Sequence, residues 1–197
     1  MRREFGIDPI EIDVGMVLQR SVASLYSHLI TRPTGRAVRL AIESQLAEVE
    51  RPSVSMIDLS EVTILDFSCA DEVVAKLLLR FLKPDRPSEA YFVLRGVSAD
   101  HLDQIETVLE RQKLLAVSES GGEFYLIGAP DALEDVVWRR LEGRETLAAE
   151  DLDDLDAEFE SDEEREALDS LVKRRVAFRV PDGGRTLSLS SLIRDLL

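Results

Sequence analysis

The sequence predicts an α/β fold, a mixed sheet with helices packed on it, followed by a small α+β domain. Two observations lead to this prediction. Up to about residue 128, short apolar stretches typical of strands alternate with longer stretches whose apolar residues recur with a helical period. From residue 129 onward, three helical stretches precede two short strand-like stretches around a Pro-Asp-Gly-Gly turn.

Three amphipathic helices are expected in the first part. The first covers residues 35–50, where apolar side chains recur three and four positions apart, and Pro52 prevents it from continuing. The second covers residues 68–82, and the third covers residues 99–112 with Ser98 as its N-cap. Each has one apolar stripe, which is typical of a helix lying on a sheet.

Strand-like stretches precede and separate these helices. In the earliest, alternate residues from Ile10 to Met16 are apolar, so one face of the strand is expected to be buried. The last two flank Gly121-Gly122 and predict a hairpin. The stretches cover residues 10–18, 54–59, 62–65, 90–94, 114–117 and 124–127.

The second part is expected to contain three helices and a hairpin. Thr146 is a candidate N-cap for the middle helix, and Ser161, followed by three acidic residues, is a strong start for the third. The helices are expected over residues 131–144, 147–155 and from 162 onward; the strands over residues 176–180 and 186–189, joined by a turn at 181–184.

The chain is acidic, with a net charge of −15. This charge argues against broad affinity for nucleic acid or for anionic membranes. Acidic residues dominate residues 145–169, and basic residues follow at 173–185. The acidic stretch is interpreted as a solvated helix face or an adaptation to a salty cytoplasm, with an acidic docking surface for a basic partner as the alternative.

Targeting and cross-linking signals are missing from the sequence. No apolar stretch approaches the roughly 20 residues of a membrane span, and the first residues lack the apolar segment of a signal peptide. With Cys69 as the single cysteine, no internal disulfide can form. We therefore expect a soluble, cytoplasmic protein without membrane contact, and leave its oligomeric state open.

The run SVSMIDLSEVTILDFSCAD, residues 53–71, is the most informative part of the chain. It reads as a strand, a turn and a second apolar stretch, after which Asp66 and Ser68 open a helix. A serine at a helix start lies near the positive end of the helix dipole, where added negative charge is tolerated. This placement suits a serine that is phosphorylated or contacts a partner, and it suits catalysis less because no base is near in sequence.

The order helix, VSMIDLSEVTILDFS, helix, AYFVLRGVS, helix resembles the STAS family, the fold of bacterial anti-sigma-factor antagonists. The resemblance covers roughly residues 8–128 and implies a STAS-like domain at residues 1–128. In that family, the second serine of an Asp-Ser-Ser-Gly motif is phosphorylated by a partner kinase. By this resemblance Asp66 matches the aspartate and Ser68 matches the phosphorylated serine.

This sequence departs from the family motif at several positions. Phe67 replaces the first serine and Cys69 replaces the glycine. Asp71 and Glu72 follow, where the family has small or apolar residues, and their charge is expected to repel a phosphate on Ser68. A thiol at a helix start also suggests either a reactive cysteine or a small packing residue at position 69.

Residues 167–176, the turn at 181–184 and the strand after it resemble a winged-helix module, which implies a winged-helix α+β domain at residues 129–197. In such modules the recognition helix enters the DNA major groove. Here that helix begins with acidic residues, so a protein-interaction or dimerisation role is preferred to DNA binding. The candidate DNA-backbone contacts are Lys173, Arg174, Arg179 and Arg185.

We therefore expect a non-enzymatic bacterial signalling or regulatory protein. Its STAS-like domain would bind a protein partner, such as a serine kinase or ATPase of the anti-sigma type, through Asp66, Phe67, Ser68 and Cys69. The alternative is a DNA-binding transcription regulator that uses the C-terminal winged helix. No metal, cofactor or catalysis is expected, because neither histidine has a metal-spaced neighbour and no nucleotide-binding motif occurs.

Overall fold

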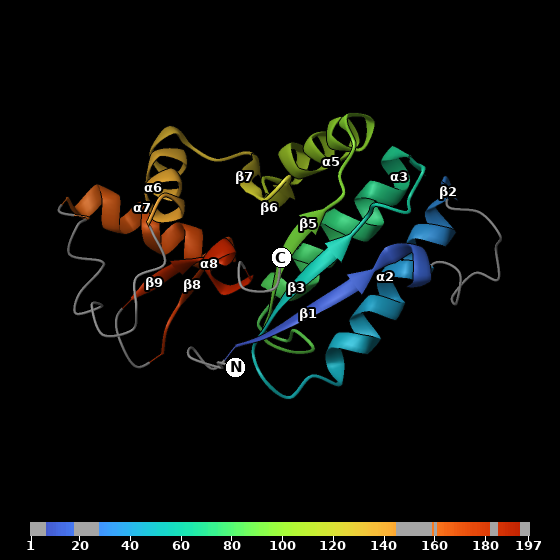
Figure 1. The fold of residues 1–197 in the computed structure, drawn as a ribbon, viewed down its shortest axis with the longest axis horizontal. Coiled ribbons are helices and arrows are strands. Elements are labelled where there is room, and N and C mark those ends of the chain that lie inside the picture. Colours follow the sequence, from blue (N-terminus) through green and yellow to red (C-terminus); the bar gives the residue numbers. More distant parts are fainter. Residues whose placement is uncertain (1–6, 18–27, 145–158, 160, 182–184, 194–197) are drawn as a thin grey trace.

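A computed structural model describes residues 7–17, 28–144, 159, 161–181 and 185–193. Its centre is a five-stranded sheet in the order β1-β3-β5-β6-β7 (Figure 1). The first four strands are parallel, and the last pairs antiparallel with its neighbour. The predicted mixed sheet is thus confirmed. The strands are β1 (Asp8–Asp13), β3 (Ser53–Asp58), β5 (Ala90–Arg95), β6 (Leu115–Ser120) and β7 (Glu123–Gly128).

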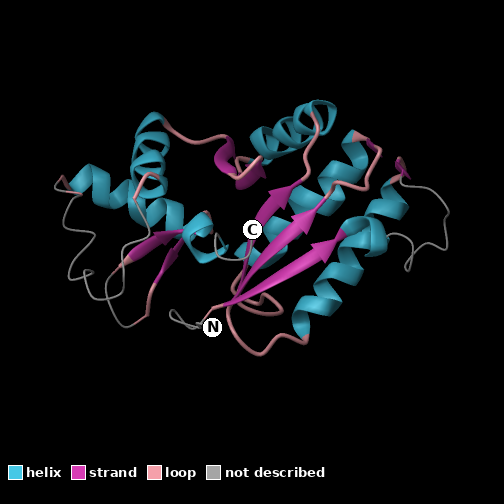
Figure 2. Cartoon of the chain, in the orientation of Figure 1, coloured by secondary structure: helices cyan, strands magenta, loops and turns pink. Residues whose placement is uncertain are grey.

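Helices of the first part cover one face of this sheet (Figure 2). Side chains such as Ile57 and Phe92 point from the sheet into a core that Val38 and Ile105 complete from the helices. The helices are α2 (Arg32–Ala47), α3 (Phe67–Ala70), the π-helix η1 (Asp71–Lys76), α4 (Leu77–Leu82) and α5 (Ala99–Gln112). Helices therefore pack on the sheet as the amphipathic patterns predicted.

The second part covers the opposite face of the same sheet. Val54 and Val93 point to this side and share a core with Trp138, and the rings of Tyr91 and Phe178 meet edge to face at 5.4 Å. Strands buried on both faces account for the continuous apolar run at residues 90–94. The elements on this face are α6 (Ala132–Glu142), α7 (Asp162–Lys173), β8 (Ala177–Arg179), β9 (Thr186–Ser188) and α8 (Leu189–Ile193).

The strand expected at 62–65 is limited to Ile64–Leu65, and the first helix ends at Ala47. Two further boundaries were predicted wrongly for clear reasons. The strand expected over residues 10–18 ends at Asp13, because its carboxylate accepts a hydrogen bond from the Met16 amide at 3.0 Å and starts a helical turn at 14–17. The helix expected from residue 35 begins at Arg32, because Thr31 caps it and a proline is tolerated in a first turn.

Several local signals were confirmed. Ser98 caps the helix that covers residues 99–112, and Gly121-Gly122, both with positive φ, joins β6 to β7. Ser161 caps α7. Two predicted features lie outside the described residues: the helix at 147–155 with its Thr146 cap, and residues 182–184 of the turn. The expected three helices and hairpin are therefore described only in part, by α6, α7 and the β8–β9 pair.

Candidate partner-binding site

The helix that carries Ser68 is fixed by a small parallel strand pair, β2 (His28–Leu29) with β4 (Ile64–Leu65). The amide of Asp66 donates to the Leu29 carbonyl at 2.9 Å, which holds the residue at the end of β4. Its backbone is extended, and its carboxylate accepts from the Cys69 amide at 2.8 Å, as an N-cap does. The helix expected to open at Asp66 is thus confirmed, with Asp66 as its N-cap.

The Ser68 hydroxyl lies in the first turn of α3 and donates to the Asp66 carboxylate, at 2.9 and 3.1 Å from its two oxygens. The residue is half-buried. Phe67, also half-buried, packs against the core beneath it. The structure thus brings Asp66, Phe67 and Ser68 together at the start of one helix.

Exposed apolar side chains adjoin this helix start. Ile64 in β4 is 43% exposed and Ile30, which directly follows β2, is 47% exposed. Their neighbours Leu29 and Leu65 are buried, so strand alternation places both isoleucines on the outward side of the β2–β4 pair. We call Ile30, Ile64, Asp66 and Ser68 the Ser68 surface.

Cys69 is not part of this surface. Its side chain is completely buried, and its Sγ donates to the Thr31 carbonyl at 3.0 Å. Burial, reinforced by the charge of Asp66, raises the pKa of the thiol to about 12. The expected contact with a partner is therefore wrong for this residue, and its place inside the domain is that of a small packing residue.

The reason is the close approach of two helices. Gly35 of α2 lies so near α3 that a β-carbon there would be 3.0 Å from the Cys69 Cα. A bulkier residue at either position would push the helices apart.

Asp71 and Glu72 are both neutralised by cations from two helices. Arg32 donates to Asp71 at 2.7 Å and to Glu72 at 3.0 Å, Arg39 lies 3.3 Å from Glu72, and Lys76 pairs with both carboxylates. Burial alone would raise the pKa of Glu72, but the hydrogen bonds from Lys76 and Arg32 outweigh it and leave that pKa below its ordinary value. We call these five residues the Glu72 cluster.

The Glu72 cluster corrects an expectation from the sequence. Two acidic residues after Ser68 were expected to repel a phosphate there, but their charges are balanced by three basic side chains. Sequence reasoning missed this cluster, although Arg32 and Arg39 are two helical turns apart and therefore share a face of α2.

A π-helix begins three residues after Ser68. The segment η1 (Asp71–Lys76) interrupts what was predicted as one continuous helix, and it contributes three residues of the Glu72 cluster. Such segments are rare and occur frequently at functional sites. We found no sequence signal that predicts it.

Arg174 is half-buried and bound by groups of the protein itself. It donates to the buried carboxylate of Glu134 at 2.5 Å and to the carbonyls of Lys113 and Ala129 at 3.0 Å each. It therefore joins α7 to the start of α6 and to the segments at both ends of the β6–β7 hairpin. This placement corrects its assignment as a DNA-backbone contact.

The other candidate DNA contacts are dispersed. Arg179 in β8 pairs with Asp169 of α7 at 2.7 Å, which neutralises its charge. Lys173 is exposed on the last turn of α7, and Arg185, half-buried, precedes β9. These three residues thus come from α7, β8 and the segment before β9.

The described residues also bear on other kinds of site. They hold no group of three or more side chains suited to bind a metal ion, and none of their helices has the length and apolar character needed to cross a membrane. His101 is buried in the first turn of α5. Comparison with models of known protein families, with curated proteins and with solved structures found no match to the chain.

Proposed function

We propose that this protein is a non-enzymatic regulatory protein whose STAS-like first part binds a protein partner through the Ser68 surface. The observation that carries the proposal is a serine hydroxyl at a helix start, held by the capping Asp66 and flanked by exposed Ile30 and Ile64. An exposed apolar residue next to a modifiable polar group suits a partner whose binding is switched. The partner class that we propose is a serine kinase or ATPase of the anti-sigma type.

The contacts of Ser68 favour a modified serine over a catalytic one. A nucleophilic serine needs a base that can take its proton. The Ser68 hydroxyl instead donates to a carboxylate that already accepts the Cys69 amide, which is the arrangement of a helix cap. The neighbouring thiol of Cys69 is buried and hydrogen-bonded to the Thr31 carbonyl, so it cannot act as a second nucleophile.

Phosphorylation of Ser68 would change the contacts of the Ser68 surface. It removes the hydroxyl proton that bonds to Asp66 and adds about −1.5 to −2 charges beside that carboxylate. Asp71 lies three residues further along the same helical face, where Arg32 binds it at 2.7 Å. A phosphate would compete with Asp71 for this arginine, so the modification alters both the charge and the local packing that a partner meets.

The second part is proposed to be a winged-helix-like interaction module. Its basic residues Arg174 and Arg179 are in ion pairs with acidic side chains of the same part. A DNA-binding regulator, the alternative function, would require these pairs to open, and the net charge of −15 would oppose its approach to DNA. Binding to a protein partner requires neither the opening of these ion pairs nor an approach to a polyanion.

The proposal is tested by affinity capture from native cells and mass spectrometry. We expect wild type to retain a partner that Ser68→Glu loses, and we expect phosphate on Ser68 in a fraction of the cellular protein. Ile64→Asp, which charges an exposed position, should reduce capture without unfolding the protein. Ser44→Glu, at an exposed serine of α2, is the matched control and should retain the partner. Identical partners for wild type and Ser68→Glu, with no phosphate on Ser68, would contradict the switch.

A further inference from the structure

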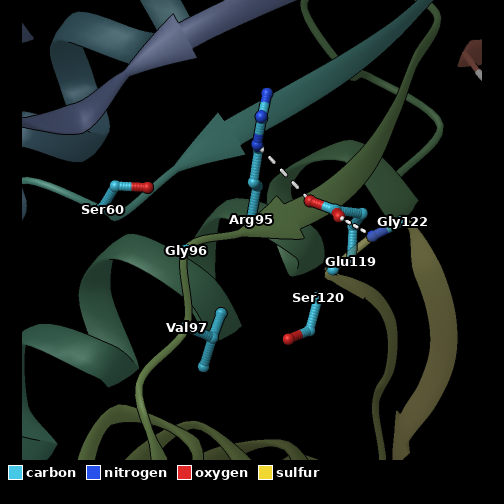
Figure 3. Close-up of a pocket in the computed structure, with 8 residues that line it drawn as sticks. Ser60, Arg95, Gly96, Val97, Glu119, Ser120 and Gly122 are labelled. Atoms are coloured by element: carbon cyan, nitrogen blue, oxygen red, sulfur yellow. Dashed lines mark hydrogen bonds and ion pairs between the residues drawn. The ribbon is translucent and has the colours of Figure 1, made fainter. Parts of the chain in front are cut away.

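A hollow of about 390 Å³ lies where three adjacent parallel strands end (Figure 3). It is lined by residues that follow or end β3, β5 and β6. Ligands of α/β sheets bind beyond the carboxyl ends of the strands, in pockets of roughly 300–1,000 Å³. The lining residues are Ser60, Arg95, Gly96, Val97, Glu119 and Ser120, with the Gly121-Gly122 turn.

A buried carboxylate forms the frame of the hollow. Glu119 accepts the Gly122 amide at 2.8 Å with one oxygen, and its other oxygen lies 3.4 Å from the Nε of Arg95 (Figure 3). It is 6% exposed, so it is a fixed part of the wall. It holds the hairpin turn and the guanidinium in place at the same time.

Arg95 has hydrogen-bond donors to spare. Its Nη1 donates to the sulfur of Met56 at 3.5 Å and lies 3.8 Å from a carboxylate oxygen of Glu11, which is a long ion pair. No described residue accepts from its Nη2. A guanidinium has five N–H donors arranged as a planar fork, so one edge of Arg95 is available to a ligand.

The remaining wall is small and polar. Ser60 and Ser120 contribute hydroxyls from the segment after β3 and from the end of β6. Gly96 has φ +67°, and a β-carbon there would be 2.2 Å from the Ser60 Oγ, so a side chain at this position would displace that hydroxyl. At Gly121 and Gly122 the space beside the backbone is open, and the Gly122 amide is already bound by Glu119.

We propose that this hollow binds a small molecule through a carboxylate or phosphate group, with Arg95 as the anion contact. A guanidinium edge matches two oxygens of either group, and charge-assisted pairs of this kind are strong. The Ser60 hydroxyl, which points toward Arg95 in Figure 3, supplies a further donor. Glu11 weakens the site only slightly, because its side chain is 66% exposed and solvent screens its charge.

The test is a titration of the full chain by amide NMR with inorganic phosphate and, separately, with acetate, against sodium chloride at equal ionic strength. We expect saturable shifts at residues 96–97 and 120–122, with millimolar affinity for these simple anions. Arg95→Gln should weaken binding at least about tenfold. Arg139→Gln, at an exposed arginine of α6, is the control and should leave it unchanged.

Glu119→Gln separates ligand binding from a merely structural role. The glutamine keeps an oxygen for the Gly122 amide but removes the charge that competes for Arg95, so we expect tighter anion binding. Tighter binding of phosphate or of acetate identifies which group the natural ligand carries. The inference is overturned if neither anion gives saturable shifts at these amides. It is also overturned if Glu119→Gln binds the anions no more tightly than wild type does. This second comparison decides the question even if Arg95→Gln fails to fold.

Discussion

Arg174→Ala should destabilise the whole protein, although the sequence suggests a surface contact to DNA. The side chain bridges Glu134 of α6 and the carbonyls of Lys113 and Ala129, which belong to the other part of the chain or to its junction. Its removal leaves Glu134 buried without its cation. The consequence therefore extends to the attachment of the second part to the sheet.

The magnitude follows from the burial of the pair. The side chains of Arg174 and Glu134 are 23% and 4% exposed, so solvent screens their interaction little. Removing one partner of a buried ion pair costs about 3–5 kcal/mol. Hydrogen bonds from charged donors contribute about 1.5–3 kcal/mol each, so the two carbonyl contacts place the estimate at the upper end of that range. For a chain of this size the melting temperature should fall by roughly 6–20 °C.

The assay is urea unfolding followed by circular dichroism and by the fluorescence of Trp138, which lies in the shared core. Lys173→Ala is the matched control: this neighbour is exposed, and its loss should cost less than about 1 kcal/mol. The argument is refuted if Arg174→Ala unfolds within 1 kcal/mol of the control. Equal losses for both variants would show that position 174 is no more buried in solution than position 173.

Two further predictions concern titratable groups near Ser68. The folded-state pKa of Glu72 is lowered, so its ionised form stabilises the protein above the ordinary glutamate pKa, and this stabilisation is lost as pH falls through the lower folded value. The stability difference between wild type and Glu72→Gln, measured by urea unfolding, should therefore shrink between about pH 5 and pH 3. A difference that stays constant with pH would contradict the ion-pair account. Cys69 has a pKa raised to about 12 and no exposed surface, so it should resist iodoacetamide at pH 8 in the native protein and react in urea. Stoichiometric labelling of a protein that still shows the native circular dichroism spectrum would exclude the buried placement.

The sequence predicted those features of the fold that depend on neighbours in the chain. Ser98 and Ser161 cap helices because a side-chain oxygen meets an amide three residues later, a contact within one turn. The run at 90–94 was predicted as a strand, and it is continuously apolar because both faces of β5 are buried. The strand at 10–18 was predicted too long because apolar alternation continues past Asp13, whose carboxylate caps a new turn.

The candidate site was predicted less completely, because its contacts join residues far apart in the sequence. Asp66 and Ser68 interact within one turn, and that local geometry was accessible. Arg32 reaches Glu72 across 40 residues, and Arg174 reaches Glu134 across 40. Charge and spacing alone cannot identify such partners, since the chain has 39 acidic residues.

The misassignment of Cys69 has the same physical origin. A small residue at the first turn of a helix faces solvent or a neighbouring helix, and the choice depends on whether that neighbour can approach. Gly35 allows the approach, but its effect on Cys69 follows only once α2 and α3 are placed side by side. Local sequence therefore predicts the cap and the hydroxyl, whereas the buried side of the same turn requires the packed structure.

The two proposed sites lie on one rim of the molecule for a reason that the sheet supplies. Helices of the first part pack on one face of the sheet and α6–α8 pack on the other. The carboxyl ends of the strands are not covered in this way. The segment that leaves β3 lines the hollow with Ser60 and then leads to the Ser68 surface. Ser60 is in that segment, and its amide is held by Asp58 at 2.8 Å; six residues later Asp66 is held by Leu29. Because the Leu59 amide also donates to the Arg95 carbonyl at 2.9 Å, a backbone hydrogen bond joins the residue proposed to contact the anion to the segment that leads to Ser68.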